Sequence, residues 1–501
     1  MLKQKSFLSL LMSVLQQLIG FVSVFFVARL MGAEALGQFS AALAFASTIM
    51  VFGDLGYGLA HYKKVSEGLD VTKCVGTFAR VKITITIILT LLVIGIILIS
   101  AFFFDINVIP GKNYLLFAVL FISVIIGNIT QIFRYTYAAL VQKAKEWASL
   151  ISVKFTTASL KIITAVFGLG VLFLGVSTLI GSIVGLFIAL YYFRNLTIGK
   201  FDKEYFKSYT KYAIPSFFIG FTSAIALQLD KVFLGWLSEP TQVGYYTAAQ
   251  SLVMIIMFVN NIFLGLLLPT YSKMNAEGNL KGISELANRI ERYIAIPLMG
   301  FGVLFIIFSS PILHIIFGNK FSDSNYIIKI LVVNAMILVF TQPYTSQLMG
   351  LNKVNLSTFI SVFMLIINLV LYIILVPSQF LGINLFGLEA EGTALSLLIT
   401  NLIGTLLFRF YAFKFTNSKP NYRIIQYLVI SLILFGGTKF IITDYFSISN
   451  NFIILIFALV VLLIYFLILR FFKMLLPSDI TFYLDTLNLK KLSSYVKGEL
   501  K

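Results

Sequence analysis

The segment KFTTASLKIITAVFG, residues 154–168, places two lysines in an otherwise apolar stretch of the chain. Lys154 and Lys161 are seven residues apart, which is two turns of helix, so both would project from one helical face. A lysine that faces lipid at the middle of a bilayer is costly. This spacing therefore predicts either a water-filled cavity or a charged partner at membrane depth.

The two lysines differ in how far they lie from the end of their segment, which Trp147 marks. Lys154 is about 10 Å along the helix from that end, so its ammonium group either snorkels to the membrane surface or lines a cavity. Lys161 is about 21 Å along, close to the bilayer middle. Its alternatives are a buried ion pair with Asp54 or Asp230, or a hydrated cavity that attracts an anion.

Arg134, on the preceding apolar segment, could join the same wall. Asn128 and Gln131 precede it by one to two turns on roughly one side. A guanidinium group offers a planar fork of donors suited to phosphate, whereas a lysine acts as a point charge. No carboxylate occurs inside the third to sixth apolar segments. Arg134, Lys154 and Lys161 together predict a cationic chamber that binds an anionic head group.

Two carboxylates are predicted within the membrane, Asp54 in GDLGYG and Asp230 in LQLDKVFLG. Asp230 and Lys231 are adjacent, hence about 100° apart on a helix, so they cannot pair face to face. One interpretation makes Asp54, Asp230 and Lys231 a gate or an ion-coupling site. The other makes them polar anchors of helix packing, and the sequence leaves both open.

The composition identifies the class of protein. The 501 residues have a mean hydropathy of +0.97, and only 12% are charged, about half the share of a soluble protein. Apolar runs of about 20 residues recur throughout, which predicts an all-α polytopic membrane protein. The fourteen predicted spans are 8–30, 36–60, 80–104, 113–141, 147–168, 170–193, 212–237, 242–270, 293–317, 325–350, 354–376, 386–413, 423–446 and 451–476.

The positive charges predict the orientation of these spans. With an even number of spans, 29 of the 38 Lys and Arg, Lys82 among them, fall on one side. Five fall on the other side and four lie inside spans. This bias predicts a multi-pass protein of the cytoplasmic (inner) membrane with both termini in the cytoplasm, and it assigns the net charge of +18 to topology rather than to nucleic acid. The amphipathic stretch 279–297 is expected to lie on the inner membrane surface.

The chain contains traces of an internal repeat. FVARLMGAEALGQFSAA (26–42) aligns without a gap with FLGWLSEPTQVGYYTAA (233–249), so that Gly37 meets Gly244. VQKAKEWASLISV (141–153) aligns with LNKVNLSTFISVF (351–363) at nearly the same offset. These matches predict two six-helix halves, residues 1–200 and 201–415, followed by two further helices at 416–478 and a cytoplasmic tail at 479–501.

Several classes of chemistry find no support in the sequence. No nucleotide-binding loop is present, and the two histidines and the single cysteine, Cys74, lack the spacing of metal ligands. No Ser-His-Asp set or paired carboxylates suggest hydrolysis. We therefore expect a transporter rather than an enzyme, with no cofactor and no metal.

Three stretches carry a resemblance to a known family. They are ARLMGAEALGQFSAALAF after the first span, FGDLGYGLAHYKK at the end of the second, and DKVFLGWLSEPTQVGYYTAAQSL across the seventh and eighth. They resemble the Wzx-type polysaccharide flippases of the multidrug/oligosaccharidyl-lipid/polysaccharide exporter superfamily. The resemblance implies two six-helix bundles around a central cavity, with two further C-terminal helices.

The resemblance also implies a function. Such proteins move a polyprenyl-(pyro)phosphate-linked oligosaccharide across the membrane by alternating access, for polysaccharide synthesis such as that of lipopolysaccharide O-antigen. The implied partners are that lipid-linked substrate, membrane lipids, and the polymerase and glycosyltransferases of the same pathway. Two alternatives stay open: a Na⁺- or H⁺-coupled multidrug extruder of the same superfamily, and a membrane polysaccharide polymerase. The extruder would favour carboxylates in its cavity, and the polymerase a large outer loop.

Overall fold

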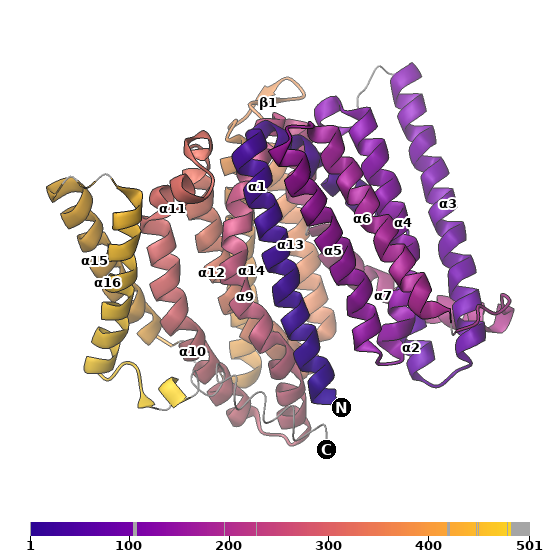
Figure 1. The fold of residues 1–501 in the computed structure, drawn as a ribbon. Coiled ribbons are helices and arrows are strands. Elements are labelled where there is room, and N and C mark those ends of the chain that lie inside the picture. Colours follow the sequence, from indigo (N-terminus) through magenta and orange to yellow (C-terminus); the bar gives the residue numbers. More distant parts are fainter. Residues whose placement is uncertain are drawn as a thin grey trace. The chain divides into compact units, whose positions relative to one another are not determined.

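The computed structural model describes residues 2–103, 108–194, 196–226, 228–417, 421–446, 448, 450–477 and 479–481. Its helices run side by side within each part of the molecule (Figure 1). Each of the fourteen predicted spans lies largely on helix, and eleven helices of the described chain are long and apolar enough to cross a membrane. The predicted all-α polytopic class is confirmed.

The chain divides into two compact units after Thr247, and the predicted boundary at residue 200 stays a prediction. The elements of the first unit are α1 (Leu2–Val51), α2 (Tyr57–Ser66), α3 (Val71–Phe103), η1 (Pro110–Lys112), α4 (Tyr114–Ala139), α5 (Lys143–Val166), α6 (Val171–Phe193), α7 (Lys203–Ala226), α8 (Leu229–Leu237) and the first two turns of α9 (Pro240–Ala276).

The second unit contains the rest of α9 and the remaining elements. They are α10 (Leu280–Ile307), α11 (Ser309–Ile316), η2 (Asn319–Phe321), α12 (Ser324–Gly350), α13 (Val354–Leu375), β1 (Gln379–Phe380), β2 (Ile383–Asn384), α14 (Glu389–Thr416), α15 (Arg423–Lys439), the π-helical η3 (Phe440–Tyr445) and α16 (Asn451–Phe471). The two strands form an antiparallel hairpin between α13 and α14.

Two breaks in the backbone shape the start of the chain. The first predicted span and most of the second lie on α1, and Gly32, with φ 86° and ψ −179°, interrupts the helical geometry between them. After Val51 the helix ends, and Leu55 and Gly56 adopt positive φ values of 44° and 80° before α2 begins. Few residues other than glycine tolerate positive φ values, so the helix cannot continue through Leu55 and Gly56. Asp54, directly before this break, therefore lies outside a regular helix.

A buried histidine ties α2 to the helices around it. The Nδ1 atom of His61 lies 2.9 Å from the hydroxyl of Tyr209 on α7, and its Nε2 atom lies 2.8 Å from Thr136 Oγ1 on α4. Its ring stacks on Phe78 of α3 at 4.4 Å between centroids. Because both ring nitrogens have partners, His61 acts as a packing residue that fixes the helices beside the cavity described below.

The aligned glycines of the internal repeat meet within the first unit. A Cβ atom on Gly37 of α1 would collide with the carbonyl of Pro240 and the amide nitrogen of Gly244. A Cβ atom on Gly244 would in turn collide with the carbonyl of Ala33. The two repeat segments therefore approach each other backbone to backbone at the position that the alignment equates, which only glycine permits.

Glycines also allow the close packing of α5 and α6. A Cβ atom on Gly185 of α6 would overlap the side chain of Val153, and its neighbour one turn earlier, Gly181, faces Thr157. We expect Gly185→Leu to destabilise the protein by about 2 kcal/mol, because overpacking forces the helices apart. Thermal unfolding in detergent measures this, with Gly95→Leu as a matched control, since no atom lies within 4 Å of a Cβ there. Equal melting temperatures for the two variants would contradict the expectation.

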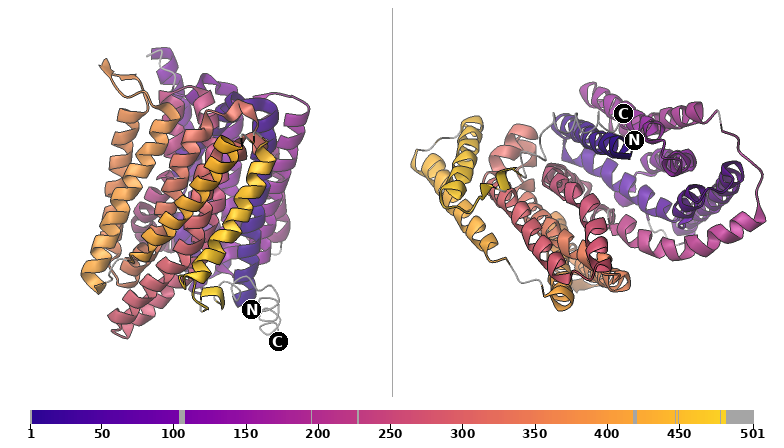
Figure 2. Two further views of the ribbon diagram at one scale, coloured as in Figure 1. Left: turned by 90° about the vertical axis from the view of Figure 1, so that its left-hand side faces the viewer. Right: turned by 90° about the horizontal axis from the view of Figure 1, so that it is seen from below.

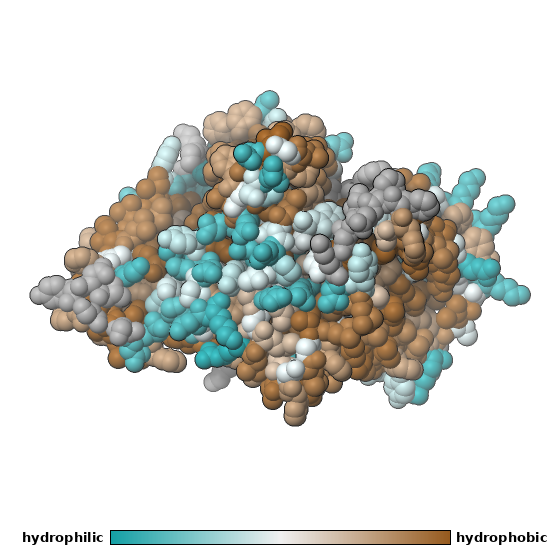
Figure 3. Space-filling model, turned by 90° about the horizontal axis from the view of Figure 1, so that it is seen from above, coloured by the Kyte–Doolittle hydropathy of each residue, from teal (hydrophilic) through white to brown (hydrophobic). Residues whose placement is uncertain are grey.

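The surface is that of a membrane protein. Large apolar side chains are exposed along α3, where Leu91 is 64% exposed, and along α16, where Leu463 is 66% exposed. Figure 2 shows α15 and α16, in yellow, side by side, and both helices carry exposed large apolar side chains. In Figure 3 brown, apolar residues cover large parts of the surface, and teal, hydrophilic residues gather in groups on the end that faces the viewer. Such a distribution fits helices surrounded by lipid.

Candidate functional site

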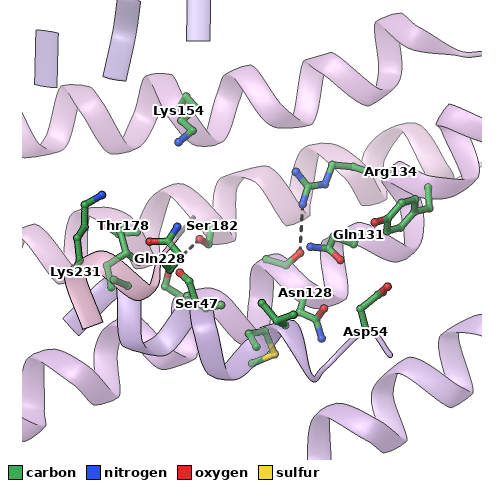
Figure 4. A pocket seen from close by; sticks show the side chains of 18 of the residues that line it. Ser47, Asp54, Asn128, Gln131, Arg134, Lys154, Thr178, Ser182, Gln228 and Lys231 are labelled. Carbon is green, nitrogen blue, oxygen red and sulfur yellow. Dashed lines mark hydrogen bonds between the residues drawn. The ribbon is translucent and has the colours of Figure 1, made fainter. Parts of the chain in front are cut away.

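A cavity of about 780 Å³ lies within the first unit, walled by α1, α2, the segment between them, α4, α5, α6, α7 and α8 (Figure 4). Four charged residues line it: Asp54, Arg134, Lys154 and Lys231. The uncharged polar residues on its wall include Ser47, Asn128, Gln131, Thr178, Ser182 and Gln228. A cavity this polar, built from membrane-spanning helices, holds water or a polar ligand.

Arg134 and Lys154 come from neighbouring helices, α4 and α5, and both line the cavity as predicted. The Nη2 atom of Arg134 reaches back 3.5 Å to the carbonyl oxygen of Gly127, and its Nε atom is buried without a hydrogen-bond partner. Lys154 is exposed on the cavity wall. Neither side chain forms an ion pair with any carboxylate of the described chain, so both charges are available to a ligand.

Lys161 lies elsewhere than its two predicted companions. Its Nζ atom sits 3.8 Å from the ring centroid of Phe39 on α1, a cation–π contact, and Lys161 is not part of the cavity lining. The alternative of an ion pair with Asp54 or Asp230 is wrong, since Lys161 pairs with no carboxylate among the described residues. Its predicted contribution to anion binding stays a prediction.

Asp54 is neutralised by a lysine that the sequence analysis counted among the cytoplasmic charges. Lys82, only 1% exposed on α3, donates to Asp54 Oδ1 and, at 2.9 Å, to Gln131 Oε1. The second carboxylate oxygen of Asp54 accepts from the amide of Gly58 at 3.2 Å. Lys82 is therefore buried within the helix bundle and paired with a carboxylate, which its count among the cytoplasmic charges did not predict; the side of the membrane on which it lies stays a prediction.

Asp230 and Lys231 point in different directions, as their 100° separation predicted. Asp230 is 3% exposed and accepts hydrogen bonds from the hydroxyl of Tyr246 and the amide of Lys231, each at 2.8 Å. Lys231 lines the cavity and pairs with no carboxylate of the described chain. The cavity therefore presents three uncompensated cations, Arg134, Lys154 and Lys231, against one carboxylate that Lys82 already neutralises. Such a site favours an anion.

Sequence reasoning missed a buried carboxylate in the second unit. Glu291 of α10, 1% exposed, accepts a hydrogen bond from Tyr344 of α12 and lies 3.6 Å from Arg409 of α14. The expectation that residues 279–297 lie on the membrane surface is wrong, because α10 is continuous from Leu280 to Ile307 and buries this face. The glutamate among isoleucines and alanines at helical spacing was the available signal.

We expect Glu291→Leu to destabilise the protein by about 3 kcal/mol, because it leaves Arg409 and the Tyr344 hydroxyl without their acceptor. Glu291→Gln keeps an acceptor for Tyr344, so its loss should be smaller. Melting temperatures of the two purified variants measure the difference. If Glu291→Leu is as stable as the natural chain, the cluster does not hold the three helices together.

The fold and the cavity place the chain among polytopic, all-helical transporters. A family model described as polysaccharide biosynthesis protein matches residues 2–275, and the chain belongs to this family. It is 25% identical over 438 residues to the probable low-salt glycan biosynthesis flippase Agl15 of Haloferax volcanii, covering 84% of this chain and 85% of the relative.

Two solved structures share the fold. The lipid II flippase MurJ in an inward closed conformation matches with a TM-score of 0.70 and 15% identity, over 93% of this chain and 99% of MurJ. An inward-facing multidrug resistance MATE family transporter of the MOP superfamily matches with a TM-score of 0.59 and 15% identity, over 81% of this chain and 96% of that chain. At this identity the likeness concerns the fold alone.

Proposed function

We propose that this protein is a flippase that moves a polyprenyl-(pyro)phosphate-linked oligosaccharide across the cytoplasmic membrane for cell-surface glycan synthesis. The single observation that carries the proposal is the cavity of about 780 Å³ with three uncompensated cations, Arg134, Lys154 and Lys231. The family and the glycan flippase among its relatives support the same class of substrate.

In this mechanism the (pyro)phosphate occupies the cavity and the polyprenyl chain stays in the bilayer. Arg134 offers paired donors and an unpartnered Nε atom to phosphate oxygens, while Lys154 and Lys231 contribute point charges. The uncharged polar wall replaces the water that the head group loses. The head group thus never crosses bare hydrocarbon, and alternating access opens the site to each side in turn.

The predicted orientation completes the proposal: both termini face the cytoplasm, so the substrate is loaded at the inner leaflet and released at the outer one. The repeat unit of an O-antigen is one candidate cargo, and the polymerase and glycosyltransferases of its pathway are the proposed partners. A multidrug extruder is disfavoured, because a cavity with excess positive charge repels cationic drugs. The polymerase alternative has no catalytic group in this cavity to support it.

The experiment is a translocation assay in proteoliposomes. A fluorescent polyprenyl diphosphate disaccharide is placed in one leaflet, and its exposure in the other leaflet is followed with a membrane-impermeant quencher. We expect the purified full chain to transfer the probe faster than protein-free vesicles or vesicles with heat-denatured protein. Equal rates with and without protein would overturn the proposed function.

A further inference from the structure

A second cavity, of about 440 Å³, adjoins the first. It shares with the first cavity the wall residues Leu59, Gln131, Arg134 and Tyr135. Its remaining wall comes from Tyr62 of α2, Ala138 of α4, and Lys143, Glu146 and Leu150 of α5. Arg134 therefore stands at the junction, so a ligand whose anionic group lies at Arg134 can extend into either space.

The two cavities differ in charge. In the second cavity Lys143 Nζ lies 2.7 Å from Glu146 Oε2, so this cation is neutralised by its neighbour one turn away. Beyond the shared Arg134, the remaining wall has no excess charge among its described residues. A carboxylate repels phosphate but accepts hydrogen bonds from hydroxyl groups. The second cavity is thus suited to a neutral polar group, while the first is suited to the anion.

Two tyrosines, Tyr62 and Tyr135, line the second cavity and give it aromatic surface. Tyr62 is 42% exposed, and neither its hydroxyl nor that of Tyr135 forms a hydrogen bond with a described residue. The ring of Tyr135 packs on the backbone of Gly58, where a Cβ atom would collide with it, and this contact fixes its position. A sugar ring has one face of C–H bonds, which packs on the electron-rich face of an aromatic ring, and a rim of hydroxyls for polar groups.

We propose that the second cavity binds the sugar residue nearest to the phosphate, between Tyr62 and Tyr135, with Glu146 as an acceptor for its hydroxyls. The inference rests on the proposed function, because it takes the phosphate to lie at Arg134. The order of groups in a lipid-linked glycan matches the order of the cavities, since the first sugar is bonded directly to the phosphate. The polyprenyl chain fits this space poorly, because Gln131, Lys143 and Glu146 would lose hydration without gaining partners.

The test compares two soluble short-chain probes, farnesyl diphosphate and farnesyl diphosphate N-acetylglucosamine, in equilibrium binding to the purified full chain. We expect Tyr62→Ala to weaken binding of the glycosylated probe by about five- to tenfold, the loss of one contact. Binding of farnesyl diphosphate should change by less than about twofold. Tyr114→Ala is the matched control, because Tyr114 is 43% exposed at the opposite end of α4 and lines neither cavity.

The outcomes separate this inference from the proposed function. Arg134→Gln should weaken binding of both probes, because both carry the diphosphate. If that holds but Tyr62→Ala changes both probes equally or neither, the sugar assignment is wrong and the anion site stands. If Arg134→Gln affects neither probe, both proposals fail. If a longer prenyl chain binds more tightly and Tyr62→Ala removes that gain, the cavity takes the lipid and the sugar assignment is overturned.

Discussion

Neutralising the three cavity cations together, as Arg134→Gln/Lys154→Gln/Lys231→Gln, should reduce glycan export to the level of cells that lack the protein. A hydrogen bond to a charged group contributes about 1.5–3 kcal/mol, so the loss of three corresponds to a rate at least about 1,000-fold lower. Surface glycan, measured at equal amounts of protein in the membrane, reports the effect. Glutamine keeps the length and polarity of the side chains, so the variant removes charge with little change in packing.

The matched control is Arg80→Gln/Lys203→Gln/Lys207→Gln. It removes the same number of arginines and lysines from the same unit, but these three side chains are exposed and line neither cavity. Export should stay close to that of the natural chain, because surface charges outside the site act weakly on a ligand. Normal export by the cavity variant, or equal losses in the two triple variants, would show that excess charge in the cavity does not carry transport.

The second large effect concerns stability. Asp54→Asn should destabilise the protein by about 3 kcal/mol, because it removes the carboxylate charge that pairs with the buried ammonium of Lys82 and leaves that ammonium with neutral acceptors such as Gln131. Breaking a buried ion pair costs about 3–5 kcal/mol of stability. The lower value applies here, because the side chain of Asp54 is 24% exposed and lines the cavity. The double variant Asp54→Asn/Lys82→Met removes both charges and should recover most of the loss. Thermal unfolding of the purified variants measures both effects.

This comparison separates an ion pair from independent packing roles. The single variant Lys82→Met is measured as well. If the loss of stability in the double variant equals the sum of the losses in Asp54→Asn and Lys82→Met, the two effects are additive and the residues do not interact. If Asp54→Asn is as stable as the natural chain, the buried ammonium of Lys82 does not need the carboxylate of Asp54. The backbone break at Leu55 and Gly56 would then have no role in placing that carboxylate beside Lys82.

The sequence predicted the helices well because apolar length is a direct physical requirement of the bilayer. Residues 354–376 and 451–476 each contain one helix close to the predicted bounds. The sequence was less informative about the places where a helix is interrupted within an apolar run. Gly32 separates two helical parts of α1, and α7 and α8 share one predicted span, because local backbone geometry leaves hydropathy unchanged.

The site was predicted in part. Arg134 and Lys154 lie on the cavity because a buried cation without a nearby carboxylate needs water or a ligand, which the sequence can indicate. Lys161 occupies the same helix face but lies over Phe39, since α1 covers that part of α5. Lys82 and Glu291 were missed because each sits near the predicted end of a span. At the end of a span, the sequence does not show whether a charged side chain is buried. The structure shows it, because Lys82 pairs with Asp54 and Glu291 pairs with Arg409.

The central claim, that excess positive charge in this cavity selects a phosphate-bearing lipid, is tested most directly by comparing two cargoes in proteoliposomes. One is a polyprenyl diphosphate disaccharide, and the other is the same polyprenyl disaccharide without phosphate. We predict that the natural chain translocates the first much faster and that Arg134→Gln/Lys154→Gln/Lys231→Gln abolishes the difference. Equal rates for both cargoes with the natural chain, or an unchanged preference in the triple variant, would contradict the account.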